Sequence, residues 1–483
     1  MPTTDYEAVI GLEVHVQIRT ASKMFCACPN AYGAQPNTHV CPVCLGYPGV
    51  LPVMNREAIR KTIAAGLMCG CDIATHSKFD RKNYFYPDMP KNYQISQYDM
   101  PLCNGGAVPI AGTGFSGKTM TDKAVRLTRM HLEEDVAKST HFAAFSVIDF
   151  NRAGVPLLEI VTEPDMAGPD EAYAFLSSLK EIMQYADVSD CDMEKGQMRC
   201  DVNVSVRPVG TAQLGTKIEI KNLNSFRAVH RGLAYEIERQ AAALDKGTEL
   251  NQETRRWNDE SGTTTVMRTK EYAHDYRYFP EPDLMPLRID ASWRAEIAEN
   301  LPETPVARRR RFVKEFGITE YDAQVLTQEK VLADYFETAA SRCSSPKSAA
   351  NWIMTELLGE LSSRGLTIAE SPVAPAAMRE LVELVADNTI SGKIGKQVFA
   401  TMMQNGEAPR KIVQDQGLTQ VSDRKIIEEH VETVIQENPD AVAEYHDGKK
   451  KALQYLVGQV MRMTRGKANP KLVSESLHKK LQQ

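Results

Sequence analysis

Alternating polar and apolar residues predict two β-strands, one near the start of the chain and one before its middle. The range 11–17 has the two-residue period of a strand, and its polar positions are Glu13, His15 and Gln17. The range 199–207 repeats the pattern, with Arg199 and Asp201 among its polar positions. A charged strand face is either the solvated side of an antiparallel sheet or the wall of a cleft for a metal and phosphates. This pattern leaves both interpretations open.

Two further segments with the same alternation, 131–135 and 157–163, are rich in carboxylates. As a strand, the first segment aligns His131, Glu133 and Asp135 on one face. The second segment aligns Glu159 and Glu163 in the same way. A salt bridge with arginine explains any single carboxylate. Four acidic strand faces in one region favour Mg²⁺, which binds through carboxylates and substrate phosphates. Lys82 and Lys91, in and after the segment 80–88, suit phosphate oxygens.

The hydrophobic period becomes helical in the second half of the chain. Strands dominate up to about residue 285, interrupted by predicted helices over 171–185 and 228–244, and helical periodicity takes over from Trp293. Three prolines, Pro280, Pro282 and Pro286, precede the change. We therefore expect an α+β chain with a β-rich domain at 1–292, a helical domain at 293–408 and a small α-helical tail domain at 409–483.

Composition and charge exclude several classes of protein. The 483 residues are 42% hydrophobic and 25% charged, an ordinary globular mixture, and the net charge of −6 means that any nucleic-acid site must be a local patch. The amino terminus lacks a basic start followed by an apolar stretch, and no run approaches the ~20 apolar residues of a membrane span. Ten cysteines in so long a chain are not a disulfide scaffold. These features predict a cytoplasmic protein without a membrane partner.

Four cysteines form two close pairs separated by twelve residues, Cys26 and Cys28, then Cys41 and Cys44. Pairs of this kind can bring four thiolates onto one tetrahedral Zn²⁺, and four sulfurs leave no position for a catalytic water. Free or redox-active thiols are the alternative. We expect a structural zinc site here and interpret the weaker pair, Cys69 and Cys71, as core residues.

The range 112–119 fits the Walker A pattern, with Lys118 and Thr119 at its end. A P-loop requires a helix to begin at that lysine, because the helix amino terminus holds the phosphate. The following residues, 124–132, alternate as a strand instead. We therefore predict a glycine-rich hairpin and not a nucleotide-binding P-loop.

The last 35 residues form a basic patch. From Lys449 to Gln483 there are nine Lys or Arg residues and one acidic residue, a composition typical of phosphate binding. Five apolar residues form one helical stripe, namely Leu453, Leu456, Val457, Val460 and Met461. The candidate nucleic-acid-binding residues are Lys450, Lys451, Arg462, Arg465 and Lys467. A merely solvated basic helix is the alternative. A second basic run, 308–311, either faces a nucleic acid or makes surface ion pairs.

Seven long blocks in one order resemble the B subunit of the bacterial and organellar tRNA-dependent amidotransferases. They span nearly the whole chain and are Gly11–His15, Phe79–Tyr86, Gln94–Tyr98, His131–Asp135, Asn151–Glu159, Asp275–Asp283 and Gly466–Pro470. The resemblance implies a cradle domain related in fold to glutamine synthetase, followed by a helical domain and a tail domain. It also implies a ligase that uses ATP and Mg²⁺ to phosphorylate the side-chain carboxylate of Glu-tRNA(Gln), Asp-tRNA(Asn) or both, and then amidates it.

The resemblance also assigns roles to residues. Carried over by position, Glu13, His15, Glu133 and Glu159 hold the Mg²⁺, and Cys26, Cys28, Cys41 and Cys44 hold a Zn²⁺. Lys82 and Lys91 line the catalytic site or the mouth of an ammonia path. The resemblance makes tRNA the ligand expected for the five basic tail residues, and its acceptor stem the ligand expected for the run 308–311. We also predict that Lys82, Arg199 and Asp201 contact ATP.

The sequence lacks an amidase signature, so ammonia must come from a partner. The family implies that this partner is the amidase, or A, subunit of the enzyme, with the small C subunit completing a heterotrimer that acts on misacylated tRNA. A tRNA-binding scaffold with a purely structural metal site remains the alternative function.

Overall fold

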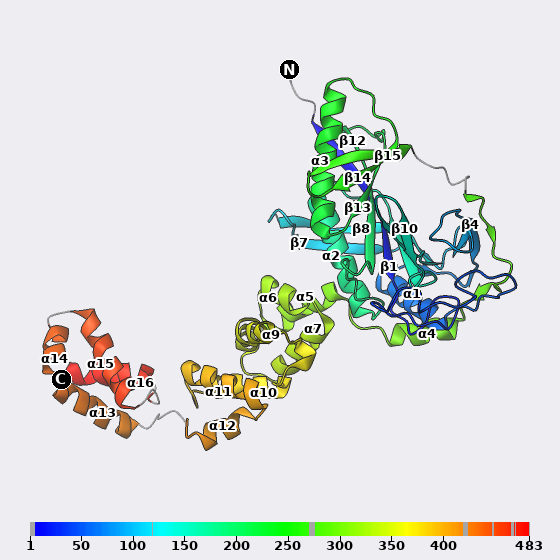
Figure 1. Ribbon diagram of the computed structural model, residues 1–483. Coiled ribbons are helices and arrows are strands. Elements are labelled where there is room, and N and C mark those ends of the chain that lie inside the picture. The colour runs from blue at the N-terminus through cyan, green and yellow to red at the C-terminus, as the bar shows by residue number, and fades with distance from the viewer. Residues whose placement is uncertain are drawn as a thin grey trace. The chain divides into compact units, whose positions relative to one another are not determined.

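Strand β1 (Tyr6–Gln17) lies near the middle of a ten-stranded sheet. The computed structural model of the chain describes residues 5–117, 119–269, 276–418, 424–446, 449–464, 468 and 470–482. It divides into two compact units, Met1–Val306 and Ala307–Gln483, here called the first and second units. The mixture of a large sheet and a helical carboxy-terminal half confirms the α+β class (Figure 1).

The sheet grows outward from β1 by mostly antiparallel pairing. Its strand order is β15 (Thr263–Thr269), β14 (Glu253–Asn258), β13 (Ile218–Leu223), β12 (Met198–Pro208), β1, β11 (Pro156–Thr162), β8 (Thr119–Glu134), β6 (Cys103–Asn104) and β2 (Asp72–Ile73). Strand β7 (Ala107–Thr113) pairs with β8, and β13 runs parallel to β14. The alternation predicted for 11–17 and 199–207 is present in β1 and β12, where apolar residues are buried and their neighbours are partly exposed.

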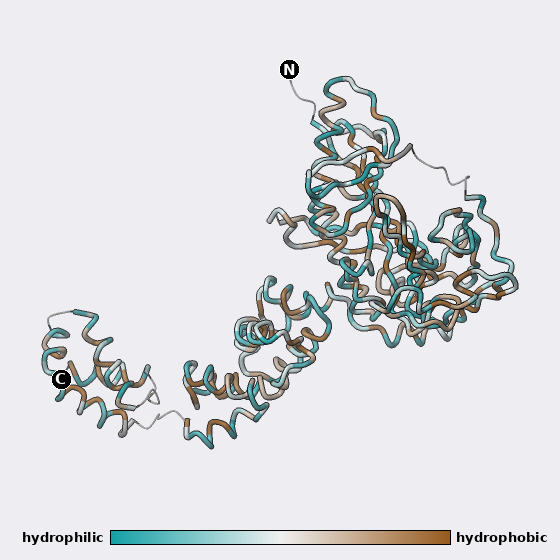
Figure 2. Tube along the Cα trace, viewed as in Figure 1, coloured by the Kyte–Doolittle hydropathy of each residue, from teal (hydrophilic) through white to brown (hydrophobic). Residues whose placement is uncertain are grey.

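Three helices cover the apolar face of this sheet. They are α1 (Arg56–Met68), α2 (Pro169–Tyr185) and α3 (Phe226–Asp245), and their buried faces share one hydrophobic core with Leu12, Val14 and Val16 of β1. Helices α2 and α3 match the predicted helical stretches, whereas α1 was not predicted. In Figure 2 hydrophobic and hydrophilic residues mix along the strands, as one-sided burial requires.

The first unit also contains three smaller sheets. One contains β16 (Phe279–Pro280), β4 (Asp80–Asn83) and β5 (Tyr93–Ser96), and a second pairs β3 (His76–Ser77) with β17 (Leu287–Arg288). The third is a hairpin of β9 (Lys138–His141) and β10 (Ser146–Asp149). Helix α4 (Ala291–Glu299) adds Ile297 to the core of the first unit.

The second unit is helical in its described parts and has two hydrophobic cores. Its helices are α5 (Pro305–Phe316), α6 (Glu320–Leu326), α7 (Lys330–Ala340), α8 (Pro346–Asn351), a π-helix (Trp352–Leu357), α9 (Leu358–Arg364), a 3₁₀-helix (Ile368–Glu370), α10 (Pro375–Ala386), α11 (Gly392–Asn405), α12 (Pro409–Asp415), α13 (Arg424–Glu437), α14 (Pro439–His446), α15 (Lys450–Met463) and α16 (Pro470–Leu481). One core spans residues 312–413 and the other 427–481. The division at residues 292 and 408 stays a prediction.

Two local expectations, the hairpin at the Walker-like stretch and the burial of one cysteine pair, are confirmed. The Walker-like stretch joins two strands, because β7 ends at Thr113 and β8 begins at Thr119; Lys118 itself lies outside the described residues. Cys69 and Cys71 are buried in the core of the first unit. Among the described residues, none of the helices combines the length and apolar character that crossing a membrane requires.

Candidate active site

The polar face of the central strands carries a row of ionisable side chains. In the register of the sheet, His15 on β1 lies opposite Glu159 on β11, which in turn lies opposite His131 on β8. On its other side, His15 lies opposite Arg199 on β12. Residues directly opposite in antiparallel strands share a face of the sheet. The separate strands predicted from the sequence therefore bring their polar faces together.

Three carboxylates surround the imidazole of His15. Its Nε2 atom lies 3.3 Å from Glu159, 3.6 Å from Glu133 and 3.8 Å from Glu13, measured to the nearest carboxylate oxygen. Glu133 also accepts a hydrogen bond of 3.3 Å from the hydroxyl of Ser96 on β5. The four residues predicted to hold Mg²⁺ thus form one cluster, drawn from three strands.

Burial and mutual repulsion shift the pKa values of these groups. Burial raises the pKa of Glu133 to about 7 and, with the charge of Glu159, raises that of Glu13. Burial opposes the charging of His15, but the hydrogen bond and charge of Glu159 raise the pKa of the imidazole to about 9. The pKa of Glu159 is lowered despite burial because two histidines face it. So much buried charge is costly unless a cation compensates it.

His131 belongs to this cluster, although it is not among the metal ligands predicted from the sequence. Its Nε2 atom lies 3.6 Å from Glu159, and its buried Nδ1 atom has no hydrogen-bond partner among the described residues. Burial lowers the pKa of His131 to about 4, so the ring is neutral near pH 7 and has a lone pair to offer. The alternation of β8, which places His131 beside Glu133, was the signal that could have identified it.

Two overlapping groups of side chains have the geometry of a metal site. Glu13, His15 and Glu159 offer ligand atoms within 4.8 Å of one another, and so do His131, Glu133 and Glu159. Glu159 is common to both. Carboxylate oxygens suit Mg²⁺ or Mn²⁺, and imidazole nitrogen is a common additional ligand of transition ions.

Cations line the same cleft. Lys82 projects from β4, and its Nζ lies 5.0 Å from the ring centre of Tyr276, while Glu133 and Glu159 raise the pKa of this amine against the effect of burial. Arg129 precedes His131 by two residues on β8, so it shares the face. Its Nε is buried without a hydrogen-bond partner, and no carboxylate of the described chain ion-pairs with it. Arg129 is not among the site residues predicted from the sequence, although the same strand alternation reaches it.

Arg199 and Asp201, predicted to contact ATP, both line the cleft but have protein partners. Arg199 donates to the buried Asp135 at 2.8 Å, and Lys221 of β13 donates to Asp201 at 2.5 Å. Asp135 also accepts from the Gln17 side chain at 2.9 Å, which gives Gln17 a supporting position beside the site. The cleft measures about 950 Å³ and has an aromatic wall that includes the stacked pair Tyr98 and Tyr278.

Glu163 lies apart from the cluster. A bulge after Val161 interrupts the pairing of β11 with β8, and Glu163 accepts a hydrogen bond from the exposed Thr128 at 2.8 Å. Residues 160–163 keep alternating between buried and partly exposed, so the predicted alignment of Glu163 with Glu159 is not contradicted, but Glu163 lies four residues further along and does not line the cleft.

The four cysteines of the predicted zinc site converge. Their sulfur atoms all lie within 4.8 Å of one another, and Cys41 and Cys44 are 3.9 Å apart. A tetrahedral Zn²⁺ with bonds of ~2.3 Å separates its sulfurs by about 3.8 Å, so the donor set and spacing fit. A hydrogen bond from Cys26 lowers the pKa of Cys44 to about 4, and the buried ammonium of Lys23 lies 3.7 Å from its sulfur.

Lys91 lies away from the acidic cleft. It forms an ion pair with Glu134, the residue after Glu133, whose side chain points to the other side of β8. The two residues line a second, smaller cavity of about 190 Å³, together with Cys26 and Cys44. The structure thus separates the two lysines that the sequence analysis grouped together.

The basic segments of the second unit are only partly described. The apolar stripe of α15 is confirmed, since Leu456 and Val460 are buried in the 427–481 core. Lys451 and Arg462 are exposed; the side chain of Lys450 and the residues Arg465 and Lys467 lie outside the described part of the chain. In the run 308–311, Arg308 and Arg311 both form ion pairs with Glu337 of α7.

Comparison with known proteins identifies similar chains. A family model described as the GatB/GatE catalytic domain matches residues 8–295, and one described as the GatB domain matches residues 334–481. A relative from Caldanaerobacter subterraneus subsp. tengcongensis is 53% identical over 477 residues, which cover 99% of both chains. Another, from Moorella thermoacetica, is 52% identical over 481 residues, 99% of this chain and 100% of its own length. Both are named as the B subunit of an aspartyl/glutamyl-tRNA(Asn/Gln) amidotransferase.

Proposed function

Since the chain belongs to the family of aspartyl/glutamyl-tRNA(Asn/Gln) amidotransferase B subunits, we propose that its acidic cleft activates the side-chain carboxylate of a misacylated tRNA. The chain is one component of a tRNA-dependent amidotransferase, a ligase that forms a carbon–nitrogen bond with glutamine as amide donor. The substrates of the proposal are Glu-tRNA(Gln), Asp-tRNA(Asn) or both. The observation that carries it is the convergence of Glu13, His15, Glu133 and Glu159 beside cations in one cleft.

The donor set of the cleft fits a divalent cation. Glu13, His15, Glu133 and Glu159 would hold Mg²⁺, and His131 is an additional candidate because its ligand atoms lie in the same cluster. When bound, the ion supplies positive charge that draws phosphate oxygens and the substrate carboxylate together. The fold relation of the cradle to glutamine synthetase is part of this proposal.

Cationic side chains of the cleft would reduce the repulsion between the substrate carboxylate and the phosphates of ATP. A carboxylate oxygen attacks the γ-phosphorus of ATP, the bond to the β-phosphate oxygen breaks, and ADP leaves, so the product is an acyl phosphate. Lys82 and Arg129 face the carboxylate cluster and would neutralise the transferring phosphoryl group, as cationic side chains do in other phosphoryl transfers. Arg199 and Asp201 border the same space, and we assign them to the ATP side of it.

The second step replaces phosphate by nitrogen. Ammonia attacks the acyl carbon, the bond to the phosphate oxygen breaks, and a proton leaves the nitrogen. Ammonia is largely protonated near pH 7, so a basic group at the cleft would help deliver it as the free base. Closing the site against water protects the reactive acyl phosphate.

Ammonia comes from a partner in our proposal. The amidase, or A, subunit would release it from glutamine, and the small C subunit would complete the heterotrimer. The smaller cavity beside Lys91 and Glu134 is a candidate entrance, because Glu134 is the neighbour of Glu133 on β8. Tyr47, Leu51 and Val53, at or next to this cavity, are strongly exposed apolar residues, which suits a protein partner.

The cysteine cluster would hold a structural Zn²⁺. Four sulfurs close the coordination sphere, so the ion would stabilise the loop 26–44 and not take part in the reaction. Hydrogen bonds from Asn37 and Asn151 connect this loop to the end of β10 and the turn after it. The cytoplasm, a reducing compartment, is where we propose that the enzyme acts.

The tail would bind the body of the tRNA. Lys451 and Arg462 present their side chains to solvent on α15, whose apolar stripe is buried. Lys450, Arg465 and Lys467 complete the proposed set from the sequence. Phosphate contacts of this kind give affinity that falls with salt.

The proposed function is tested with Glu159→Gln in the reconstituted heterotrimer. We expect tRNA-dependent ATP cleavage and amidation to fall at least about a hundredfold, because Glu159 is shared by both ligand groups. Amidation is measured with ammonium chloride as well as with glutamine, so that the partner's chemistry is bypassed. Each misacylated tRNA is assayed separately.

Glu163→Gln is the matched control, since it removes a carboxylate just beyond the same strand and outside the cluster. It should keep normal rates. Full activity of Glu159→Gln would contradict the catalytic assignment and favour the scaffold function.

A further inference from the structure

Two phenylalanines are exposed at the tip of the β9–β10 hairpin. The side chains of Phe142 and Phe145 are 54% and 60% exposed, and their rings stack with centroids 4.9 Å apart and an angle of 27° between planes. The main chain closes the turn through a 2.8 Å hydrogen bond from Phe142 N–H to the Phe145 carbonyl. The two adjacent rings form one contiguous apolar patch exposed to water, and contiguous exposed apolar patches commonly mark binding sites.

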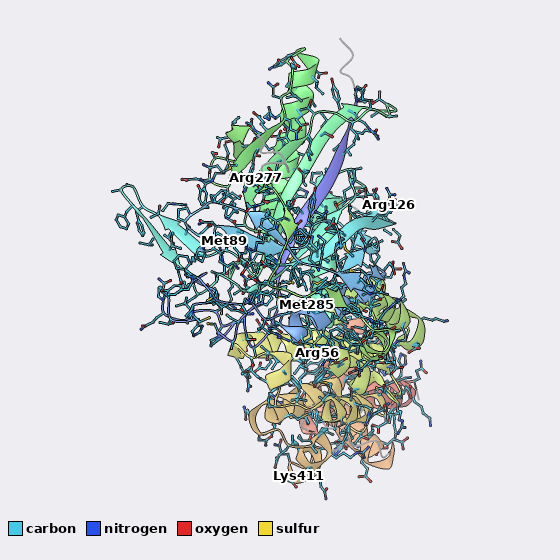
Figure 3. All side chains as sticks on the ribbon, turned by 90° about the vertical axis from the view of Figure 1, so that its right-hand side faces the viewer. Arg56, Met89, Arg126, Arg277, Met285 and Lys411 are labelled. Atoms are coloured by element: carbon cyan, nitrogen blue, oxygen red, sulfur yellow. The ribbon has the colours of Figure 1, made fainter. Side chains whose placement is uncertain are left out.

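The stem that carries these rings is firmly attached to the strands of the active site. Ala137 donates to the carbonyl of Asp88 at 2.9 Å, and Arg152 donates to the carbonyls of Val136 and Ala137 at 2.8 and 2.9 Å. Phe150 donates to the side chain of Asn37 at 2.8 Å. Figure 3 shows the hairpin as a cyan two-stranded ribbon that projects from the first unit near Met89. The tip is therefore exposed on a fixed support.

The hairpin borders the acidic cleft. His141, the last residue of β9, lines the cleft together with Glu133 and Glu159, and the chain reaches β9 only three residues after the end of β8. The hydroxyl of Ser146 lies 2.7 Å from Nδ1 of His141 and holds this ring across the hairpin. The phenylalanine next in sequence to His141 thus lies at the rim of the site.

We propose that Phe142 and Phe145 form a stacking platform for the unpaired 3′-terminal bases of the aminoacyl-tRNA, an inference that rests on the proposed function. The amino acid is esterified to the terminal ribose, so only a few bonds separate its side-chain carboxylate from the terminal base. When the carboxylate occupies the cleft, that base must lie at the rim. Aromatic side chains stack on unpaired bases of any sequence, which is how single-stranded RNA is commonly held.

The charges of the hairpin agree with a nucleic-acid occupant. Its exposed cation is Lys138. Its acidic residue, Asp149, is occupied by backbone hydrogen bonds from Asn37 and Asn151, both of 3.0 Å. Asp149 also lies opposite Lys138 at the base of the hairpin, so no carboxylate of the described hairpin lies at its tip. The apolar surface at the tip is also small, two rings and Val147, whereas a stable protein interface needs about 800 Å² per partner.

The test uses the reconstituted heterotrimer and misacylated tRNA. Phe142→Ala combined with Phe145→Ala should raise KM for the tRNA about tenfold or more and change kcat less, because each lost stack weakens binding. Phe142→Trp with Phe145→Trp should keep KM near the wild-type value, whereas the double leucine variant should behave as the alanine variant. Val147→Ala, which alters the same hairpin without removing a ring, is the control.

A shortened tRNA provides a second readout that a structural role would not move. Removing the terminal 3′ nucleotides should weaken binding to the wild-type complex, measured by competition, and should have little further effect on the double alanine variant. If the two changes together weaken binding less than the sum of their separate effects, the terminal nucleotides contact the two phenylalanines. Equal losses from shortening in both proteins would overturn the proposal.

Other results also decide the matter. An unchanged KM in the double alanine variant, or full rescue by leucine, would overturn the stacking role. Loss of the amidase partner from the variant complex on gel filtration would instead identify the hairpin as a protein contact. Failure of the wild-type complex to amidate either tRNA would overturn the proposed function itself, which is a distinguishable outcome.

Discussion

Gly46 lies directly against Lys91. A Cβ atom built on Gly46 would be 2.5 Å from Cγ of Lys91, and Gly46 has the left-handed φ of +69°. Lys91 in turn forms the ion pair with Glu134 that borders the smaller cavity. Absence of a side chain at position 46 therefore determines where this lysine can lie.

Gly46→Ala should displace Lys91 from Glu134. We expect the rate of glutamine-dependent amidation to fall about tenfold or more, because a small displacement in the path of the ammonia can lower the rate strongly. Amidation with added ammonium should change less. The ratio of the two rates in the complex is the measurement. Gly49→Ala is the matched control, because its φ is +84° but nothing lies within 4 Å of the added Cβ. Equal ratios in both variants would contradict the role of the cavity.

Arg129→Gln should impair phosphoryl transfer. The guanidinium faces the carboxylate cluster with its Nε unpartnered, and loss of one such donor commonly lowers kcat about a hundredfold. ATP cleavage in the presence of misacylated tRNA is the measurement. The control is Arg126→Gln on the same strand, a side chain 68% exposed and ion-paired with Asp165 at 2.7 Å. Comparable losses in both variants would argue against a specific role for Arg129.

His131→Ala should weaken divalent-cation binding. Its ring nitrogen lies among the ligand atoms of Glu133 and Glu159, and loss of such a group typically costs at least about tenfold in affinity. Titration of the complex with Mn²⁺, followed by electron paramagnetic resonance, measures this directly. The control is His230→Ala, because His230 lies on α3, beside Asp170 of α2 and outside the metal cluster. An unchanged affinity would remove His131 from the metal site.

Cys44→Ser should abolish zinc binding. Elemental analysis of the wild-type protein should find one zinc per chain, and the variant should have none. The melting temperature of the first unit should fall by about 10 °C, because the loss of a structural ion costs several kcal/mol. Cys343→Ser, in the second unit, should keep both the zinc and the melting temperature. A wild-type protein without zinc would show that the cysteines act as thiols.

Arg308→Gln should destabilise the second unit in a pH-dependent manner. Arg308 lies 2.6 Å from Asp334 and 2.7 Å from Glu337. Burial raises the pKa of Asp334, but hydrogen bonds from Lys330 and Arg308 outweigh it, so that this pKa is lowered. The pKa of Glu337 is lowered by hydrogen bonds from Arg311 and Arg308.

A carboxyl whose pKa falls on folding stabilises the protein above its ordinary pKa and loses that effect as the pH drops through the folded value. The variant should therefore lose about 1–2 kcal/mol of unfolding free energy at pH 7, and less below about pH 4. This value is smaller than for a fully buried ion pair because Asp334 and Glu337 are partly exposed, so water screens their charges. Thermal unfolding at both pH values measures this. Arg310→Gln is the exposed control. Reduced tRNA affinity without a stability change would favour the acceptor-stem interpretation of this run.

The sequence by itself determined which faces of the strands are polar. The two-residue alternation of β1 and β12, and the close spacing of the four cysteines, follow from local geometry, and they are present as predicted. Helices α2 and α3 were also recognisable, because a long apolar stripe depends only on residues nearby in the chain.

Only the tertiary structure decided which polar faces meet. The register that places His15 opposite Glu159 joins segments more than a hundred residues apart, and alternation carries no information on pairing partners. The one-residue step from Glu133 to Glu134 placed Lys91 on the other side of β8, and Glu163 contacts Thr128 beyond the end of β11, apart from the cluster. Strand pairing and side-chain direction therefore decide which of the charged residues lie together in one cleft. Both depend on packing over the whole domain.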